Sequence, residues 1–267
     1  MSNAPSIGLV INTYNAPEKL EAVFHWLAVA GGCDEVLVAD DGSKSETREL
    51  IATWQNSMPR WGLKHIWQED QGYRRSRILN RTIAQANADY LVFIDGDCLP
   101  FKRFITDHQA LAERGAFVQG RRCFVPQSKV KAITTFKTSI FSLLITGQLG
   151  GAFKAIRWPM PVIKRNRELH GILGCNLGIW RDDLIAVNGY DESFEGWGAE
   201  DSDLAARLYH HGLIRKFVYG RAQLAHLNHD ELPRDRYDAN KEKLTATLGE
   251  KRVRCSLGLD QHLQPEA

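Results

Sequence analysis

The stretch that decides the fold is YLVFIDGD, residues 90–97. Its first five residues are nearly all apolar, which predicts a strand buried in the sheet of an α/β protein. Asp95 and Asp97 follow directly, separated by a single glycine. Divalent cations prefer such carboxylate oxygens, and a nucleotide diphosphate supplies further ligands. Asp and Gly are also common in plain turns, so this pair alone does not separate a metal site from a turn.

The chain before this stretch alternates strands with helices. Short apolar runs predict strands at residues 6–11, 36–39 and 64–68, and helices are predicted between them and across 73–87. This alternation predicts an α/β fold with a mostly parallel, Rossmann-like central sheet flanked by helices. Ligands of such sheets bind beyond the carboxyl ends of the strands, which is where Asp95 and Asp97 fall.

A second acidic cluster, Asp40-Asp41-Gly42-Ser43, follows the strand predicted at 36–39. One interpretation is a strand-to-helix turn in which Ser43 and Glu46 form a capping box. The other is a ligand contact, in which a carboxylate accepts the N3–H of uracil or binds a ribose hydroxyl. The two interpretations are compatible, because a helix cap and a ligand contact can share one turn.

Further along, the segment WGAED (197–201) opens a helix predicted at 199–211. Acidic residues are common in the first turn of a helix, because the helix dipole favours them there. Asp201, however, precedes apolar residues at spacings of three, four and seven, so we expect its side chain to point inward. A carboxylate that points inward usually has a partner or a task.

Basic and imidazole side chains supply further candidates. Arg74, Arg77 and Arg81 share one predicted helix face, where they either contact a phosphate or form a solvated basic surface. His226 and His229 follow a strand predicted at 215–219, and either ring can add a nitrogen ligand to a metal held by Asp97. A purely structural histidine is an equally weighted alternative. A polar surface helix is predicted from Arg236 to Lys251.

The net charge of +2 hides an uneven distribution. Residues 121–170 contain ten Lys or Arg and one acid, Glu168, so this segment carries +9 and the other 217 residues sum to −7. An anionic membrane surface and a phosphorylated acceptor both fit such a segment. Nucleic acid is not expected as a partner, because no nucleic-acid-binding signature accompanies the charge.

Composition excludes several classes of protein. Hydrophobic residues make up 43% and charged residues 25% of the 267 positions, which excludes disordered, collagen-like and coiled-coil chains. Five cysteines at scattered spacings, without a CxxC pair, support neither a disulfide framework nor a zinc knuckle. The sequence has no apolar run of about 18 residues and no signal-peptide pattern, so a cytoplasmic location is expected.

The motifs follow one another in a characteristic order: TYN (13–15), DDGS (40–43), DQGYRRSRILN (70–80), DGD (95–97) and GCNLGIWRDDLIAVNGYDESFEGWGAEDSDLAARL (174–208). In this order they resemble a family 2 glycosyltransferase of the GT-A fold with a galactosyltransferase-type C-terminal region. The resemblance implies a nucleotide-sugar-binding half at 1–120 and an acceptor-binding, catalytic-base half of the same domain at 121–230. Residues 231–267 are then expected to form a helical tail.

The resemblance also implies roles for single residues. Asp41 would contact uracil, Asp95 would lie near the ribose, and Asp97 would bind Mn²⁺ or Mg²⁺. His226 or, as second choice, His229 would complete the metal site. Asp201 is expected as the catalytic base and Trp197 in the acceptor pocket. Other nucleotide-sugar contacts are expected from Thr13, Tyr14, Asn15, Asp40, Arg74, Asn176 and Glu200. Relatives often have Phe in place of Tyr73 and Arg in place of Leu79, and the second departure puts a donor contact at position 79 in doubt.

These roles predict an inverting transfer, in which Asp201 takes a proton from an acceptor hydroxyl as the nucleoside diphosphate leaves. The expected donor is a nucleotide-sugar, with UDP-sugars preferred. The expected acceptor is a glycan or a lipid-linked sugar in polysaccharide or lipopolysaccharide synthesis, at the inner face of the membrane. The alternatives are a non-catalytic carbohydrate- or partner-binding module and a sugar nucleotidylyltransferase. The latter needs a Gly-rich basic loop, which INTYNAPEKL (11–20) does not supply.

Overall fold

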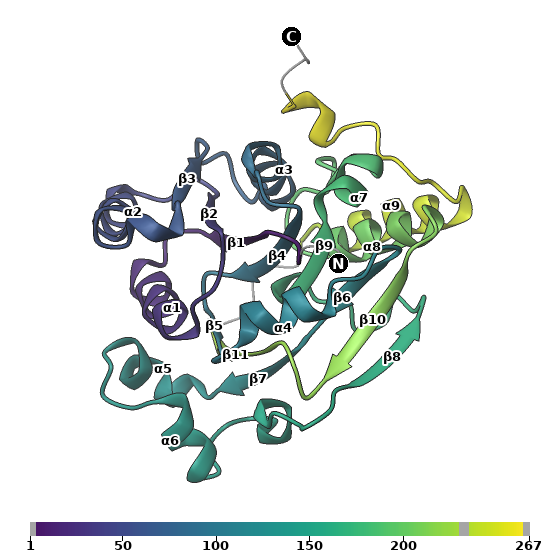
Figure 1. Cartoon of the computed structure of the whole chain (residues 1–267). Coiled ribbons are helices and arrows are strands. Elements are labelled where there is room, and N and C mark those ends of the chain that lie inside the picture. The colour runs from purple at the N-terminus through teal and green to yellow at the C-terminus, as the bar shows by residue number, and fades with distance from the viewer. Residues whose placement is uncertain (1–3, 230–234, 264–267) are drawn as a thin grey trace.

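The computed structural model describes residues 4–229 and 235–263, which fold around an eight-stranded sheet (Figure 1). Its strands are β1 (Ile7–Thr13), β2 (Glu35–Asp40), β3 (Lys64–Trp67), β4 (Tyr90–Asp95), β6 (Ala116–Gln119), β8 (Val162–Asn166), β9 (Leu177–Trp180) and β10 (Ile214–Tyr219). They lie in the order β3-β2-β1-β4-β9-β6-β10-β8. The first four strands are mutually parallel, whereas β9 and β8 run antiparallel to their neighbours. The carboxyl ends of β1, β2 and β4 therefore meet at one edge.

Helices cover both faces of this sheet, because successive strand residues point to opposite sides. In β1, Leu9 and Ile11 pack into the core on one face, and Val10 packs into the core on the other. The first face is covered by α1 (Pro17–Ala30), α2 (Ser45–Ser57) and α4 (Phe104–Leu111). The second face is covered by α3 (Arg75–Gln85), α7 (Arg181–Ala186) and α8 (Glu200–His210).

A smaller sheet, in the order β5-β11-β7, lies beside the large one. It consists of β5 (Cys98–Pro100), β7 (Arg121–Val125) and β11 (Gln223–Leu227). Antiparallel pairing sets His226 of β11 opposite Cys98 of β5, so this ring comes to lie beside Asp97. The small sheet thus brings a C-terminal histidine to the end of β4.

Most elements predicted from the sequence are confirmed, with ends within two residues of those observed, including α9 (Tyr237–Gly249). The predicted capping box is wrong: α2 begins after Lys44, and the hydroxyl of Ser43 accepts a hydrogen bond from the backbone N–H of Asn15 at 2.8 Å. His226 lies within β11, a strand that periodicity missed. Residues 126–170 showed no period, yet they contain α5 (Gln127–Thr134), α6 (Ile140–Ile145) and β8.

Strands from both sides of position 120 share the large sheet. The expected start of the tail at residue 231 lies outside the described residues. Among the described helices, none is long and apolar enough to cross a membrane.

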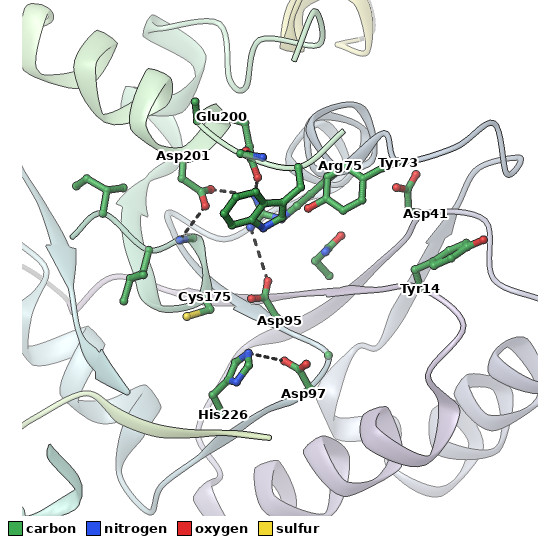
Figure 2. A pocket seen from close by; sticks show the side chains of 18 of the residues that line it. Tyr14, Asp41, Tyr73, Arg75, Asp95, Asp97, Cys175, Glu200, Asp201 and His226 are labelled. Carbon is green, nitrogen blue, oxygen red and sulfur yellow. Dashed lines mark hydrogen bonds and ion pairs between the residues drawn. The ribbon is translucent and has the colours of Figure 1, made fainter. Parts of the chain in front are cut away.

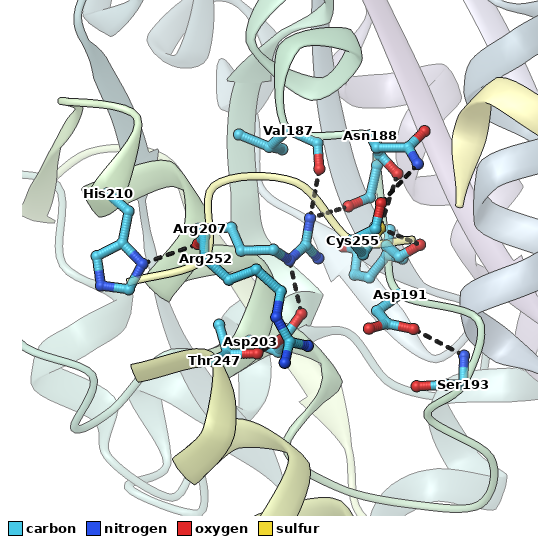
Figure 3. A network of polar contacts seen from close by, with 12 residues as sticks. Val187, Asn188, Asp191, Ser193, Asp203, Arg207, His210, Thr247, Arg252 and Cys255 are labelled. Atoms are coloured by element: carbon cyan, nitrogen blue, oxygen red, sulfur yellow. Dashed lines mark hydrogen bonds and ion pairs between the residues drawn. The ribbon is translucent and has the colours of Figure 1, made fainter. Parts of the chain in front are cut away.

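A buried polar network fixes α8 in place (Figure 3). Arg207 is fully buried, and its Nε donates to Asp203 one turn earlier at 2.8 Å. Its Nη1 donates to the carbonyls of Val187 and Gly189, each at 2.7 Å. Asp203 also accepts from the hydroxyl of Thr247 on α9 at 2.7 Å. These contacts tie α8 to the turn after α7 and to α9, and so hold the first turn of α8 in a defined position.

Candidate active site

A cavity of about 830 Å³ lies beyond the carboxyl ends of β1, β2 and β4, and the first turn of α8 closes its far side (Figure 2). Ten residues that the sequence singled out line it: Thr13, Tyr14, Asp41, Asp95, Asp97, Trp197, Glu200, Asp201, His226 and His229. These residues span positions 13 to 229, so the fold brings them together from distant parts of the sequence. The fold thus assembles most of the predicted site residues in one place.

The end of the cavity near β2 is built around Asp41. This carboxylate accepts from Gln68 Nε2 at 2.6 Å and from the backbone N–H of Arg74 at 2.8 Å. Burial raises the pKa of Asp41 above its usual range. Gly42 follows with φ +99°, and a Cβ there would lie 2.6 Å from Cα of Asp70, so glycine is required at this close approach. Asp41 is therefore rigidly held, with further lone pairs available to a ligand.

Two acceptors at the end of β1 have no partner within the described structure. Oδ1 of Asn12 and Oγ1 of Thr13 are both buried without a hydrogen bond. Both residues line the cavity. Buried polar groups are normally paired, and these two atoms stay unpaired beside the cavity.

Asp97, His226 and His229 form a candidate metal site. Their ligand atoms all lie within 4.8 Å of one another. Nε2 of His229 lies 3.2 Å, and Nε2 of His226 3.5 Å, from the carboxylate of Asp97. Burial lowers the pKa of His226 to about 4, so this ring is neutral near pH 7 and can donate a lone pair. One carboxylate and two imidazoles fit Mn²⁺ better than Mg²⁺, which prefers oxygen ligands.

Arg75 joins the two acidic walls of the cavity. Its Nη1 lies 2.9 Å from Asp201 and 3.3 Å from Glu200, and its Nη2 lies 3.7 Å from Asp95. Figure 2 shows this guanidinium between the end of β4 and the start of α8. Burial raises the pKa of Asp95 to about 6 and that of Glu200 to about 7. One cation therefore lies among three carboxylates. The raised pKa values of Asp95 and Glu200 disfavour the ionised forms of these two.

Asp201 is oriented by two contacts. Its Oδ1 accepts from Arg75, and its Oδ2 accepts from the backbone N–H of Gly174 at 3.0 Å. A Cβ on Gly174 would lie 2.4 Å from both carboxylate oxygens of Asp201, so any larger residue here would displace that carboxylate. The side chain remains 22% exposed toward the cavity. This is the arrangement that a general base requires: a fixed carboxylate, hydrogen-bonded yet accessible.

Four residues expected to contact the nucleotide-sugar do not line the cavity: Asn15, Asp40, Arg74 and Asn176. Asp40 is fully buried, and its oxygens lie 2.8 Å from the backbone N of Ser43 and 2.8 Å from Nε2 of His65. Asn176 is also fully buried and bonds to His108 and to two backbone carbonyls. Both side chains are used within the fold, which explains their types without a ligand.

Asn15 and Arg74 are next in sequence to residues that line the cavity, and both make hydrogen bonds within the fold. The side chain of Asn15 accepts from the backbone N–H of Lys44 at 2.9 Å, at φ 45°. Arg74 gives its backbone N–H to Asp41, while the next residue, Arg75, reaches into the cavity. The sequence carried a signal for Arg75, because Ile78 and Leu79, three and four positions later, are buried. That is the spacing that identified Asp201.

Lys19 and Arg122 were also missed. Nζ of Lys19 lies 3.6 Å from Asp97, and Arg122 donates to the thiol of Cys175 at 3.1 Å. Both line the cavity. They add positive charge where a diphosphate would meet the metal ligands, but no short motif marked either residue.

Comparison with known families assigns most of the chain. The family described as glycosyl transferase family 2 matches residues 9–184, and the N-terminal domain of galactosyltransferase matches residues 158–230. Validoxylamine A glucosyltransferase from Streptomyces hygroscopicus subsp. limoneus is 26% identical over 79% of this chain and 49% of its own length. Chondroitin synthase from Escherichia coli is 24% identical over 80% of this chain and 34% of its own. The chain thus spans about half the length of the first relative and about a third of the second.

Solved structures agree on the fold. TarS residues 1–349 from S. aureus, in complex with UDP-GlcNAc, matches 96% of this chain and 69% of its own with a TM-score of 0.67 and 14% identity. The mannosyltransferase PcManGT from Pyrobaculum calidifontis, with GDP-Man and Mn²⁺, matches 94% of this chain and 65% of its own with a TM-score of 0.59 and 17% identity. These neighbours are GT-A glycosyltransferases, and the predicted fold is confirmed. The chain belongs to glycosyltransferase family 2.

Proposed function

We propose that the chain transfers a sugar from a nucleotide-sugar, preferably a UDP-sugar, to a glycan or lipid-linked acceptor with inversion at the anomeric carbon. This proposal rests on one cavity whose two walls carry different functional groups. Asp97, His226 and His229 form one wall, and Asp201 with its backbone hydrogen bond from Gly174 stands in the other. A leaving diphosphate and an attacking hydroxyl need such opposed sites in a single displacement.

In this proposal Asp97 and the two histidines hold Mn²⁺, which supplies positive charge to the departing diphosphate when bound. Lys19 and Arg122 reinforce that charge. Asp41 accepts from the base and Asp95 from the ribose. Glu200, whose pKa of about 7 leaves it partly protonated at neutral pH, either donates to or accepts from a sugar hydroxyl.

Asp201 takes the proton of the acceptor hydroxyl as that oxygen attacks. Arg75 pairs with this carboxylate at 2.9 Å, and the backbone N–H of Gly174 fixes its direction. A positioned carboxylate base contributes roughly 10²–10⁴-fold to such a step. Trp197 lines the acceptor side, where its ring stacks with that of Tyr237 at 5.8 Å between centroids. Both rings offer an apolar surface on which a sugar can rest.

The relatives point to a class of product. Chondroitin synthases and a hyaluronan synthase are similar to this chain, and we therefore propose a reaction in polysaccharide, lipopolysaccharide or related cell-surface synthesis. We further propose a cytoplasmic enzyme that touches the inner face of the membrane. Its support is the series of exposed apolar side chains from the end of α5 to the start of β8, a segment that also contains two lysines and one arginine. The exposed residues of this series are Phe136, Phe141, Ile145, Phe153, Ile156, Met160, Val162 and Ile163.

The membrane contact is tested by flotation with anionic and neutral vesicles. Phe141→Ser combined with Ile145→Ser is expected to lower binding to anionic vesicles, since both side chains are more than two-thirds exposed. Val29→Ser, equally exposed on α1, is the matched control. Equal flotation of all three proteins would remove this part of the proposal.

The reaction is tested by nucleoside diphosphate release from a panel of UDP- and GDP-sugars with Mn²⁺. The proposal predicts slow turnover of one donor, with water as acceptor, and loss of that turnover in Asp97→Ala. No turnover of any donor, together with no thermal shift by UDP and Mn²⁺, would favour the non-catalytic binding module. Formation of a nucleotide-sugar from a nucleoside triphosphate and a sugar phosphate would favour the nucleotidylyltransferase.

A further inference from the structure

A second cavity, of about 450 Å³, adjoins the first one, and five Arg or Lys residues but only one acid line it. The two cavities share Arg122 and Leu173. The second cavity lies over β7, β8 and β10, and its charged and aromatic lining residues are Arg121, Arg122, Phe124, Lys154, Lys164, Glu168, His170, Arg215, Phe217 and Tyr219. We call it the basic cavity.

Alternate residues of β10 form the floor of the basic cavity. Arg215, Phe217 and Tyr219 are spaced by two and so point to the same face of the sheet. The antiparallel register sets Lys164 of β8 opposite Phe217 and Asn166 opposite Arg215. Lys216, between them, points to the other face and donates to the carbonyl of Leu111. The basic face is therefore a consequence of strand register, not of a flexible loop.

Aromatic rings hold the cations in place. The guanidinium of Arg121 lies 5.0 Å from the ring centre of Phe217 and 4.7 Å from that of Tyr219. Nζ of Lys164 lies 5.7 Å from the ring of Tyr219, and Arg122 lies 5.2 Å from that of Phe124. Cation–π contacts orient these groups without neutralising them.

The positive charge of the basic cavity is not balanced from within. Across residues 4–229 and 235–263, no carboxylate lies within 4.0 Å of a side-chain nitrogen of Arg121, Arg122, Lys154 or Lys164. Glu168, the acid in the lining, is 70% exposed and pairs with Arg215 at 3.8 Å. Burial, and then the charges of Arg121 and Arg122, lower the pKa of Lys154. An anion placed here would relieve this repulsion.

We propose that the basic cavity binds an anionic sugar residue of the acceptor, through a carboxylate or a phosphate group, while the neighbouring sugar presents its hydroxyl to Asp201. Arginine and lysine pair well with both anions, and the aromatic walls offer apolar surface to the sugar ring. The assignment to an acceptor rests on the proposed glycosyl transfer. The binding of the anionic saccharide does not, because it needs neither donor nor metal.

The test is equilibrium binding of three probes to the protein without nucleotide, measured by calorimetry. Trigalacturonic acid supplies carboxylates, glucose 6-phosphate supplies a phosphate, and maltotriose is neutral. We expect at least one anionic probe to bind tenfold or more tightly than maltotriose. Lys154→Glu combined with Lys164→Glu is expected to weaken that binding tenfold or more. Which anionic probe binds identifies the source of the charge.

Lys131→Glu combined with Lys137→Glu is the matched control, with the same charge change in the same segment but outside the basic cavity. It is expected to bind the anionic probe as the wild type does. Equal affinity for all three probes, or equal losses in both double variants, would overturn the proposal. So would a cavity variant that loses only flotation with anionic vesicles, which would assign the charge to a membrane. Binding of UDP with Mn²⁺ is followed in every variant. Its absence in the wild type would count against glycosyl transfer while leaving the saccharide result intact.

Discussion

Two buried arginine–carboxylate groups contact the same helix, α8, yet their surroundings differ. Arg207 and Asp203 are both almost fully buried, and backbone carbonyls and Thr247 take up most of their remaining hydrogen bonds (Figure 3). Arg75 is nearly as buried, but its partners Asp201 and Asp95 have side chains that are 22% and 32% exposed in the cavity. The first group is closed and the second is open on one side.

The difference teaches how to separate a structural ion pair from a functional one. The partners of the closed group lie on α8, on α9 and in the turn after α7. All of them are buried, so no ligand can reach the group. In the open group three carboxylates crowd around one cation, which leaves negative charge facing a cavity. A fold does not gain stability from that excess, so the open group is the one expected to act on a substrate.

The largest effect is expected from breaking the closed group. Arg207→Met leaves Asp203 buried without its cation, and breaking such a pair costs roughly 3–5 kcal/mol. We expect a loss of this size in the free energy of unfolding, measured by urea denaturation. Arg114→Met, which breaks the exposed pair with Asp182, is the control and should cost less than about 1 kcal/mol. Similar losses in both variants would contradict the comparison.

Breaking the open group should affect catalysis more than stability. Arg75→Met removes the partner of Asp201, but the freed carboxylates can take up protons or water from the cavity. We expect donor turnover to fall roughly 10²–10³-fold, similar to the loss of one well-placed catalytic donor, with a smaller loss of unfolding free energy than in Arg207→Met. Donor turnover within about tenfold of wild type would show that Arg75 does not act through Asp201.

A substitution at Gly174 can displace the catalytic base Asp201 without changing any charged side chain. Gly174→Ala would place Cβ 2.4 Å from the carboxylate of Asp201 and so push it away. A misplacement of this kind can cost about 10²-fold in rate. Donor turnover is the readout, and Gly249→Ala, where a Cβ would meet open space, is the control. Normal turnover in Gly174→Ala would mean that the position of Asp201 is not critical.

The smallest effect concerns Glu200 and pH. Burial raises the pKa of Glu200 from 4.5 to about 7, so the folded protein binds this proton more tightly than the unfolded chain does. The stability contributed by the protonated carboxyl is complete below pH 4.5 and is lost as pH rises through 7. Glu200→Gln cannot ionise, and should therefore gain on the order of 1–3 kcal/mol relative to wild type between pH 4.5 and 8. A constant difference in unfolding free energy across this range would contradict the raised pKa.

Local patterns sufficed for the parallel half of the sheet. Its strands are short apolar runs and its helices have clear periods, so their ends were predictable to within two residues. Asp201 could be assigned an inward direction from its spacing to Leu204, Ala205 and Leu208. Arg75 obeys the same spacing rule, but the spacing of Arg74, Arg77 and Arg81 favours those residues for the binding role. They share another helix face and are only half-buried.

The second sheet, the metal-site histidine and the basic cavity depend on contacts between segments that are distant in the sequence. The second sheet joins residues 98–100, 121–125 and 223–227, and no local pattern specifies that register. The place of His226 beside Asp97 follows from it. The basic cavity likewise depends on the pairing of β8 with β10, although its charge excess was visible in residues 121–170. Asp40 and Asn176 carry polar side chains that the fold itself uses, which a motif cannot distinguish from ligand contacts.

The most direct test of the account compares donor binding with chemistry in Asp201→Asn. The affinity for UDP with Mn²⁺ and the rate of nucleoside diphosphate release from the preferred donor are measured on the same preparation. The account predicts an affinity within about threefold of wild type and a rate lower by roughly 10²–10⁴-fold, because Asn keeps the shape of Asp201 but cannot accept the proton. A rate within tenfold of wild type at unchanged affinity would contradict the assignment of Asp201 as the base.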